Sequence, residues 1–191
     1  PMGARPDLRR HLEPIGPVLV FAASNFPFAF STIGGDSASA LAAGNSVVLK
    51  AHSGHPKLTV ATADVVRSAL SEAGAPDGLF QVILGTDAGR SAVVDPRIKA
   101  AGFTGSIPGG RALFDLASSR PDPIPFYGEL GSNNPVFVTA TAAERSTAEI
   151  RDGFIGSFTL GAGQFCTKPG TFIIPADSDL ATSLRSVALP D

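Results

Sequence analysis

Short apolar runs rich in β-branched residues alternate along the chain with longer segments of helical character. Such runs, bounded by glycine, proline or polar residues, are typical of buried strands. The sequence predicts strands at Pro17–Phe21, Ser46–Lys50, Phe80–Ile83, Ala100–Thr104, Ile124–Glu129, Val136–Thr139 and Thr171–Ile174. Between them we predict helices at about 28–43, 56–73 and 88–94, from about 109 onward, at 142–159, and after the cap signal at 177–179.

The alternation of strand and helix predicts an α/β fold, a doubly wound Rossmann-like parallel sheet followed by the start of a second α/β domain. The proline-rich stretch 118–125 is the best candidate for a hinge between the two. We therefore expect one domain over residues 1–124 and the first part of another over 125–191. Parallel sheets bind ligands beyond the carboxyl ends of their strands, so chemistry is expected just after each strand.

Composition narrows the class of protein further. The chain is 43% hydrophobic with a net charge of -2 and scattered basic residues, which argues against a nucleic-acid partner. We find no apolar run long enough for a bilayer and expect no membrane partner. One cysteine excludes an internal disulfide and favours a reducing compartment, the cytoplasm. The start (residues 1–6) reads as mid-chain and lacks a signal-peptide core, and the end (residues 188–191) has no closing element, so we expect a fragment.

Three polar residues are candidates for catalysis. A lone cysteine is more often a small buried hydrophobe, but Cys166 lies in a glycine-rich loop where a thiolate could attack a carbonyl carbon. Glu129 ends a strand between two glycines; it is either a solvated carboxylate or a general base. Asn25 follows the first strand, as a turn residue or as an amide that donates to an oxyanion.

Other candidates concern a phosphate-bearing ligand. The segment Gly105–Gly110 follows a strand and opens a helix, and helix N-termini bind phosphate. No G-x-G-x-x-G fingerprint follows the first strand. Lys50 ends the second strand, where a lysine is usually just solvated. His52 and His55 have no carboxylate or thiol close in sequence, so we predict no metal site.

In their order along the chain, five motifs resemble those of the aldehyde dehydrogenase superfamily. They are Asn25–Pro27 (N-F-P), Gly44–Lys50 (G-N-x-V-V-x-K), Phe103–Gly110 (F-T-G-S-x-x-x-G), Glu129–Gly131 (E-L-G) and Gly163–Cys166 (G-Q-x-C). Each motif is modest, but their ordered occurrence by chance is very improbable. Two departures are Ile107, where the family commonly has threonine, and Ser132–Asn134, which replaces the family's second glycine and its neighbours.

The resemblance implies a role for each candidate. Cys166 attacks an aldehyde to form a thiohemiacetal, the amide of Asn25 and the backbone N–H of Cys166 hold the oxyanion, and hydride leaves for a nicotinamide cofactor. Glu129 then activates the water that hydrolyses the thioester to an acid. Ser106, with Gly105 and Gly110, would meet the cofactor's pyrophosphate. The later segments that complete such an enzyme, among them a glutamate that grips the nicotinamide ribose, lie beyond these residues, so activity of this chain alone is doubtful.

The cofactor is expected to be NADP, with NAD possible. NAD-preferring members place a glutamate three residues after the lysine, and Ser53 stands there, so no carboxylate repels a 2′-phosphate. Lys50 adds positive charge, and Arg90 is either a second phosphate contact or a solvated helix residue.

Within the superfamily the sequence most resembles 2-oxoglutarate semialdehyde (2,5-dioxovalerate) dehydrogenases. This likeness rests on Ala22–Ser31, Gly34–Asp36 and Lys50–Pro56. It implies a semialdehyde substrate and a homo-oligomeric parent enzyme. Alternatives are a fatty or other aldehyde dehydrogenase, an acylating relative that uses coenzyme A, against which Glu129 argues, and an inactive dinucleotide-binding fragment.

Overall fold

The computed structural model of the chain describes residues 7–187 and divides into two compact units. The first unit runs to Glu129 and the second begins at Leu130. Residues 1–6 and 188–191 lie outside the described residues. The expectation of a fragment, and that of no signal peptide at the start, rest on these residues. Each unit is described by itself.

The first unit is built on a five-stranded parallel sheet with the strand order β3-β2-β1-β4-β5. The strands are β1 (Val18–Phe21), β2 (Val47–Lys50), β3 (Phe80–Ile83), β4 (Ala100–Gly105) and β5 (Phe126–Leu130). β1 pairs in parallel with both β2 and β4, and the order therefore reverses between them. The predicted doubly wound, Rossmann-like fold is confirmed, and its switch point lies at the carboxyl ends of β1 and β4.

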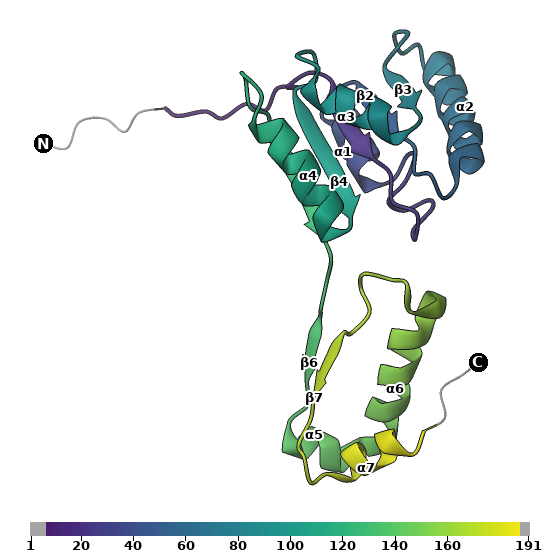
Figure 1. The fold of residues 1–191 in the computed structure, drawn as a ribbon, viewed down its shortest axis with the longest axis vertical. Coiled ribbons are helices and arrows are strands. Elements are labelled where there is room, and N and C mark those ends of the chain that lie inside the picture. Colours follow the sequence, from purple (N-terminus) through teal and green to yellow (C-terminus); the bar gives the residue numbers. More distant parts are fainter. Residues whose placement is uncertain (1–6, 188–191) are drawn as a thin grey trace, which may run out of the picture. The chain divides into compact units, whose positions relative to one another are not determined.

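Two pairs of helices cover the two faces of this sheet (Figure 1). They are α1 (Gly35–Ala42) and α2 (Pro56–Glu72) on one face, and α3 (Thr86–Val94) and α4 (Ile107–Ser118) on the other. Alternation along β1 accounts for both cores, because successive residues of a strand face opposite sides. Leu19 and Phe21 pack with α3 and α4, whereas Val20 and Ala22 pack with α1 and α2.

The helix predicted from residue 28 begins only at Gly35. Residues 27–33 form successive turns instead, in which Gly35 N–H donates to Ala29 O (3.0 Å) and Ala23 N–H donates to Phe30 O (2.8 Å). A Cβ at Gly34 would lie 2.2 Å from Ala29 O, so the turn closes onto backbone that only glycine can approach. The effect is to fold the segment after β1 back over the strand's end.

The boundary between the units also lies later than the expected 124/125. Ala101 N–H donates to Pro125 O (3.0 Å), and β5 continues from there beside β4 as the edge strand of the first sheet. The proline-rich stretch before β5 is tied down by Arg120, which is buried and donates to the carbonyls of Val93 and Ile98 (both 3.1 Å). The predicted hinge is therefore packed against the first unit.

The second unit consists of a two-stranded parallel sheet, β6 (Pro135–Phe137) and β7 (Thr171–Ile173), with helices between and after them. These are α5 (Ala140–Arg145), α6 (Thr147–Thr159), the short 3-10 helix η1 (Leu160–Gly163) and α7 (Asp179–Arg185). The single helix predicted at 142–159 is interrupted at Ser146, whose φ of -136° is not helical. α6 packs on β7 through stacked rings of Phe154 and Phe172, 3.9 Å apart.

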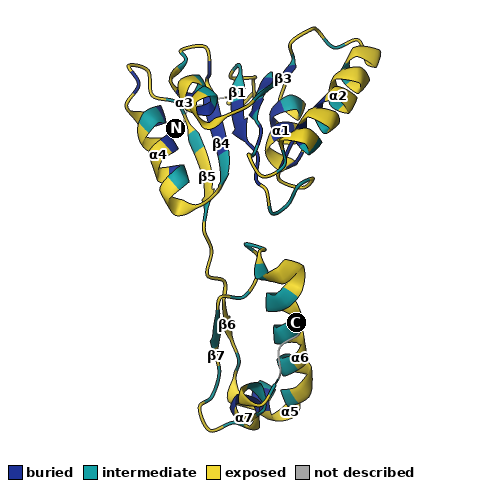
Figure 2. Ribbon diagram, turned by 45° about the vertical axis from the view of Figure 1, so that its right-hand side comes forward, coloured by how far each residue is buried: buried dark blue, intermediate teal, exposed yellow. Residues whose placement is uncertain are grey.

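Burial is uneven along the chain (Figure 2). Buried residues gather in the sheet of the first unit, whereas α6 has no buried residue among those described. Within residues 7–187, none of the helices combines the length and the apolar character that a bilayer crossing requires.

Candidate active site

The segment that carries Asn25 leaves the carboxyl end of β1, beside the switch point of the sheet. Ala22 N–H donates to Lys50 O (3.1 Å), which extends the strand pairing by one residue. His55 Nε2 donates to Ala23 O (3.0 Å), and its Nδ1 lies 3.2 Å from Thr59 Oγ1. Half-buried Asn25 therefore follows a backbone anchored to β2 and to the start of α2.

Lys50 lies at the same edge, at the end of β2 and in register with Phe21 of β1. Its aliphatic stem covers Gly89 of α3, where an added Cβ would lie 3.0 Å from Lys50 Cγ. Arg90, the next residue of α3, is exposed. Partial burial lowers the pKa of Lys50 from its ordinary value, because the charged form loses solvation.

The two histidines after β2 are engaged within the protein. His52 Nδ1 accepts from Gly54 N–H (3.0 Å) in a tight turn that exposes Ser53. The pKa of His52 is lowered by burial, then by the charges of Lys50 and His55. Residues 7–187 contain no group of three or more histidine, cysteine, aspartate or glutamate side chains that could hold a metal ion.

Ser106 caps the N-terminus of α4, directly after β4. Its Oγ accepts from Gly109 N–H (3.2 Å), so the hydroxyl stabilises the first turn and keeps its own hydrogen to donate. Gly110 is buried, and its N–H already donates to Ser106 O (2.9 Å). Of the predicted phosphate contacts, Gly105 and Ser106 are exposed at the start of α4, while Gly110 is buried in its first turn.

Glu129 is exposed near the end of β5. Its charge contributes to the raised pKa of Asp36, whose larger cause is desolvation of the carboxyl group. Asp36 as a residue is exposed, but its carboxylate lies against the backbone of β4: a Cβ on Gly102 would be 3.1 Å from Oδ2. The two carboxylates thus share one side of the sheet, a neighbourhood that no motif suggested.

Cys166 belongs to the second unit and lies, half-buried, in the segment between η1 and β7. The residues before it take an unusual path. Gly161, Ala162 and Gly163 have φ values of +61°, +54° and +68°, in the left-handed region that alanine rarely adopts. This path turns the chain sharply between α6 and the cysteine.

The segment Ser132–Asn134 holds the backbone that follows the cysteine. Asn134 Nδ2 donates to Cys166 O (2.6 Å) and to Lys168 O (2.9 Å), and Ser132 Oγ donates to Cys166 O. Gly170 N–H donates to Asn133 O (2.7 Å). The sequence marked these three residues only as a departure from a motif. Their contacts span more than thirty positions, and periodicity gives no signal of such pairs.

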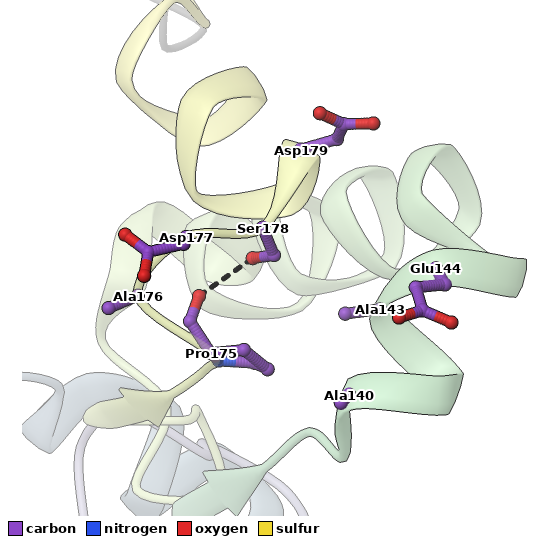
Figure 3. A pocket seen from close by; sticks show the side chains of 8 residues that line it. All are labelled: Ala140, Ala143, Glu144, Pro175, Ala176, Asp177, Ser178 and Asp179. Atoms are coloured by element: carbon purple, nitrogen blue, oxygen red, sulfur yellow. Dashed lines mark hydrogen bonds between the residues drawn. The ribbon is translucent and has the colours of Figure 1, made fainter.

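None of the predicted catalytic residues, Asn25, Glu129 and Cys166, lines the hollow drawn in Figure 3. The hollow in Figure 3, of about 350 Å³, lies where the loop before α7 faces α5, and its charged side chains are Glu144, Asp177 and Asp179. Ser178, which caps α7, donates to Pro175 O (2.7 Å) across its floor. It is a local gap between two short helices and carries no feature of the predicted site.

Residues 5–182 match the aldehyde dehydrogenase family. The chain therefore belongs to this family, and the resemblance drawn from its five motifs is confirmed.

Among similar proteins is the alpha-ketoglutaric semialdehyde dehydrogenase of Acinetobacter baylyi, which is 49% identical over 94% of this chain. The chain spans 35% of that relative's length. Two solved structures are also similar, each at 28% identity. One is an NADP-dependent enzyme of E. coli, with a TM-score of 0.73 over 91% of this chain and 34% of the other. The other is a NAD-dependent benzaldehyde dehydrogenase of Corynebacterium glutamicum, with a TM-score of 0.68 over 85% and 34%.

Proposed function

We propose that the protein oxidises an aldehyde to its carboxylic acid with NADP, and that Cys166 is the nucleophile. The single observation that carries this proposal is the match of residues 5–182 to the family, with a cysteine retained in the G-Q-x-C motif. Asn25 and Glu129 would complete the set, on the first unit's side of the chain.

The reaction divides into an oxidation and a hydrolysis. The Cys166 thiolate forms a carbon–sulfur bond with the aldehyde carbon, and the carbonyl electrons move onto oxygen. The Asn25 amide and the Cys166 backbone N–H hold that oxyanion. When NADP is bound, it supplies the acceptor for the hydride that leaves the carbon. Glu129 then takes a proton from water, which attacks the thioester; the carbon–sulfur bond breaks, and the acid and the thiolate are released.

The first unit's residues fit a dinucleotide. The exposed start of α4 after β4 is suited to a pyrophosphate, with the Ser106 hydroxyl as a donor. Lys50 ends β2 and Ser53 lies in the turn that follows it, while Arg90 lies in α3, the helix after β3; two of the three are cations. The absence of a carboxylate at Ser53 favours a 2′-phosphate, and hence NADP over NAD.

For the substrate we propose 2-oxoglutarate semialdehyde. The support is the 49% identity to an enzyme of that name over nearly the whole chain. A fatty or other aldehyde is the alternative, since the chain spans only part of its relatives. We also propose that the parent enzyme is a homo-oligomer.

The test uses the full-length protein, NADP and a panel of aldehydes, with reduced cofactor followed by absorbance. Cys166→Ala should abolish hydride transfer, whereas Glu129→Gln should leave a single-turnover burst followed by slow acid release. Turnover by Cys166→Ala at the wild-type rate would refute the assignment of the nucleophile.

A further inference from the structure

We propose that Asn134 is a positioning residue for the nucleophile. In this account its side-chain amide, assisted by Ser132, fixes the peptide that follows Cys166 and so orients the thiol for attack. The inference rests on the proposed role of Cys166. It assigns a task to a segment that otherwise appears only as a deviation from the E-L-G-G motif.

The amide of Asn134 has the donors that the task requires. Its two N–H hydrogens match two carbonyls, Cys166 O at 2.6 Å and Lys168 O at 2.9 Å. Cys166 O has two lone pairs, and the second accepts from Ser132 Oγ. With this carbonyl held from two sides, the peptide plane on the C-terminal side of Cys166 has little freedom to rotate.

The segment around the cysteine needs such an anchor. Before it come two glycines and an alanine in left-handed conformation, and after it no regular structure begins until Thr171. Glycine-rich backbone loses more conformational entropy on ordering than other backbone does. Hydrogen bonds from a distant part of the chain offset that loss at the residue whose geometry matters most for attack.

Asparagine also suits the backbone at this position. Asn134 has a φ of +40°, a region where asparagine and aspartate are enriched among residues other than glycine. Glycine would keep the backbone path without any side chain, and aspartate would keep the shape while replacing the donors with a carboxylate. Two substitutions can therefore separate the amide's contacts from the backbone's requirement.

The experiment compares Asn134→Asp and Asn134→Gly with wild type in the full-length protein. A carboxylate facing two carbonyl oxygens repels them, and a displacement of the thiol by about 1 Å lowers kcat by about 100-fold. We expect that loss for Asn134→Asp and a smaller loss for Asn134→Gly. KM for NADP should be unchanged in both, because the residues proposed to hold the dinucleotide lie in the other unit. The rate at which iodoacetamide alkylates Cys166, followed by peptide mass spectrometry, should change in parallel with kcat.

Thr171→Val is the matched control. It removes the hydrogen bond from Thr171 Oγ1 to Asn133 Oδ1 (2.9 Å) in the same cluster without touching the cysteine carbonyl, and kcat should stay at the wild-type value. The proposal is overturned if both Asn134 variants keep wild-type kcat, or if both fail to fold while Thr171→Val folds. Turnover by Cys166→Ala, in contrast, would overturn the proposed function itself.

Discussion

Replacing Ser53 with glutamate tests the proposed preference for NADP, because it introduces the carboxylate that the family resemblance associates with NAD. Ser53 is exposed in the turn after β2, so the longer side chain can be accommodated without repacking the core. The new carboxylate would face the 2′-phosphate of NADP, whereas the two ribose hydroxyls of NAD could donate to it. Affinity for NADP should fall, and affinity for NAD should hold or rise.

The size of the loss in NADP affinity follows from the exposure of Ser53 to solvent. Two unit charges about 4 Å apart repel by about 1 kcal/mol in water, so a doubly charged phosphate costs about 2 kcal/mol at this exposed position. Loss of the serine's hydrogen bond to a charged group adds about 1.5 kcal/mol. The total of about 3.5 kcal/mol corresponds to a weakening of about 300-fold in Kd for NADP.

Calorimetric titration of the full-length protein with each cofactor measures the two affinities separately. Ser53→Gln is the matched control, because glutamine has nearly the shape of glutamate without the charge. It should lose only the serine's hydrogen bond, which weakens the Kd for NADP by about tenfold. The added charge should also weaken NADP binding less as salt rises. Equal losses of NADP and NAD affinity in Ser53→Glu would instead place residue 53 away from the 2′-phosphate and overturn its proposed role.

Two further predictions concern stability and are measured by urea denaturation. Asn45 is buried, and its Oδ1 accepts from Ile15 N–H (2.8 Å) and Gly16 N–H (3.0 Å), so Asn45→Ala should lower the free energy of unfolding by about 3 kcal/mol. A loss below about 1 kcal/mol would mean that water replaces the amide. The pKa of Asp36 is raised, first by burial and then by Glu129, so the folded state holds this proton more tightly than the unfolded chain. Ionisation of Asp36 therefore lowers the free energy of unfolding above the raised pKa and has no effect below the unfolded value near 4. Asp36→Asn should raise the free energy of unfolding at pH 7 but not at about pH 3. A gain that is the same at both pH values would contradict this account.

Much of the first unit could be predicted from the sequence, because its strands are short apolar runs that alternate with segments of helical character. β1 to β4 lie within a residue or so of the predicted ranges. The start of α1 was wrong, since helix propensity in residues 28–34 is overridden by the close approach of Gly34 to Ala29. The break at Ser146 was also missed, although Ser146 and Glu149 have the S-x-x-E spacing that is typical of a helix start.

For the candidate site, the sequence proposes residues but gives no information about their contacts. Motifs indicate Cys166, Glu129 and Asn25 as candidates, while the surroundings of each depend on contacts between distant positions. The anchoring of Cys166 by Asn134, and the shared neighbourhood of Asp36 and Glu129, become visible only when the backbone is folded. Capping by Ser106, in contrast, could be read from its place before a helix.

The central claim, that Cys166 carries the acyl group during turnover, is tested most directly by trapping that group. The full-length Glu129→Gln protein is mixed with NADP and 2-oxoglutarate semialdehyde, quenched in acid, digested and analysed by mass spectrometry. We expect an acyl thioester on the peptide that contains Cys166, formed together with one equivalent of reduced cofactor. Reduced cofactor without any acyl group on that peptide, in a variant whose turnover equals wild type, would contradict it.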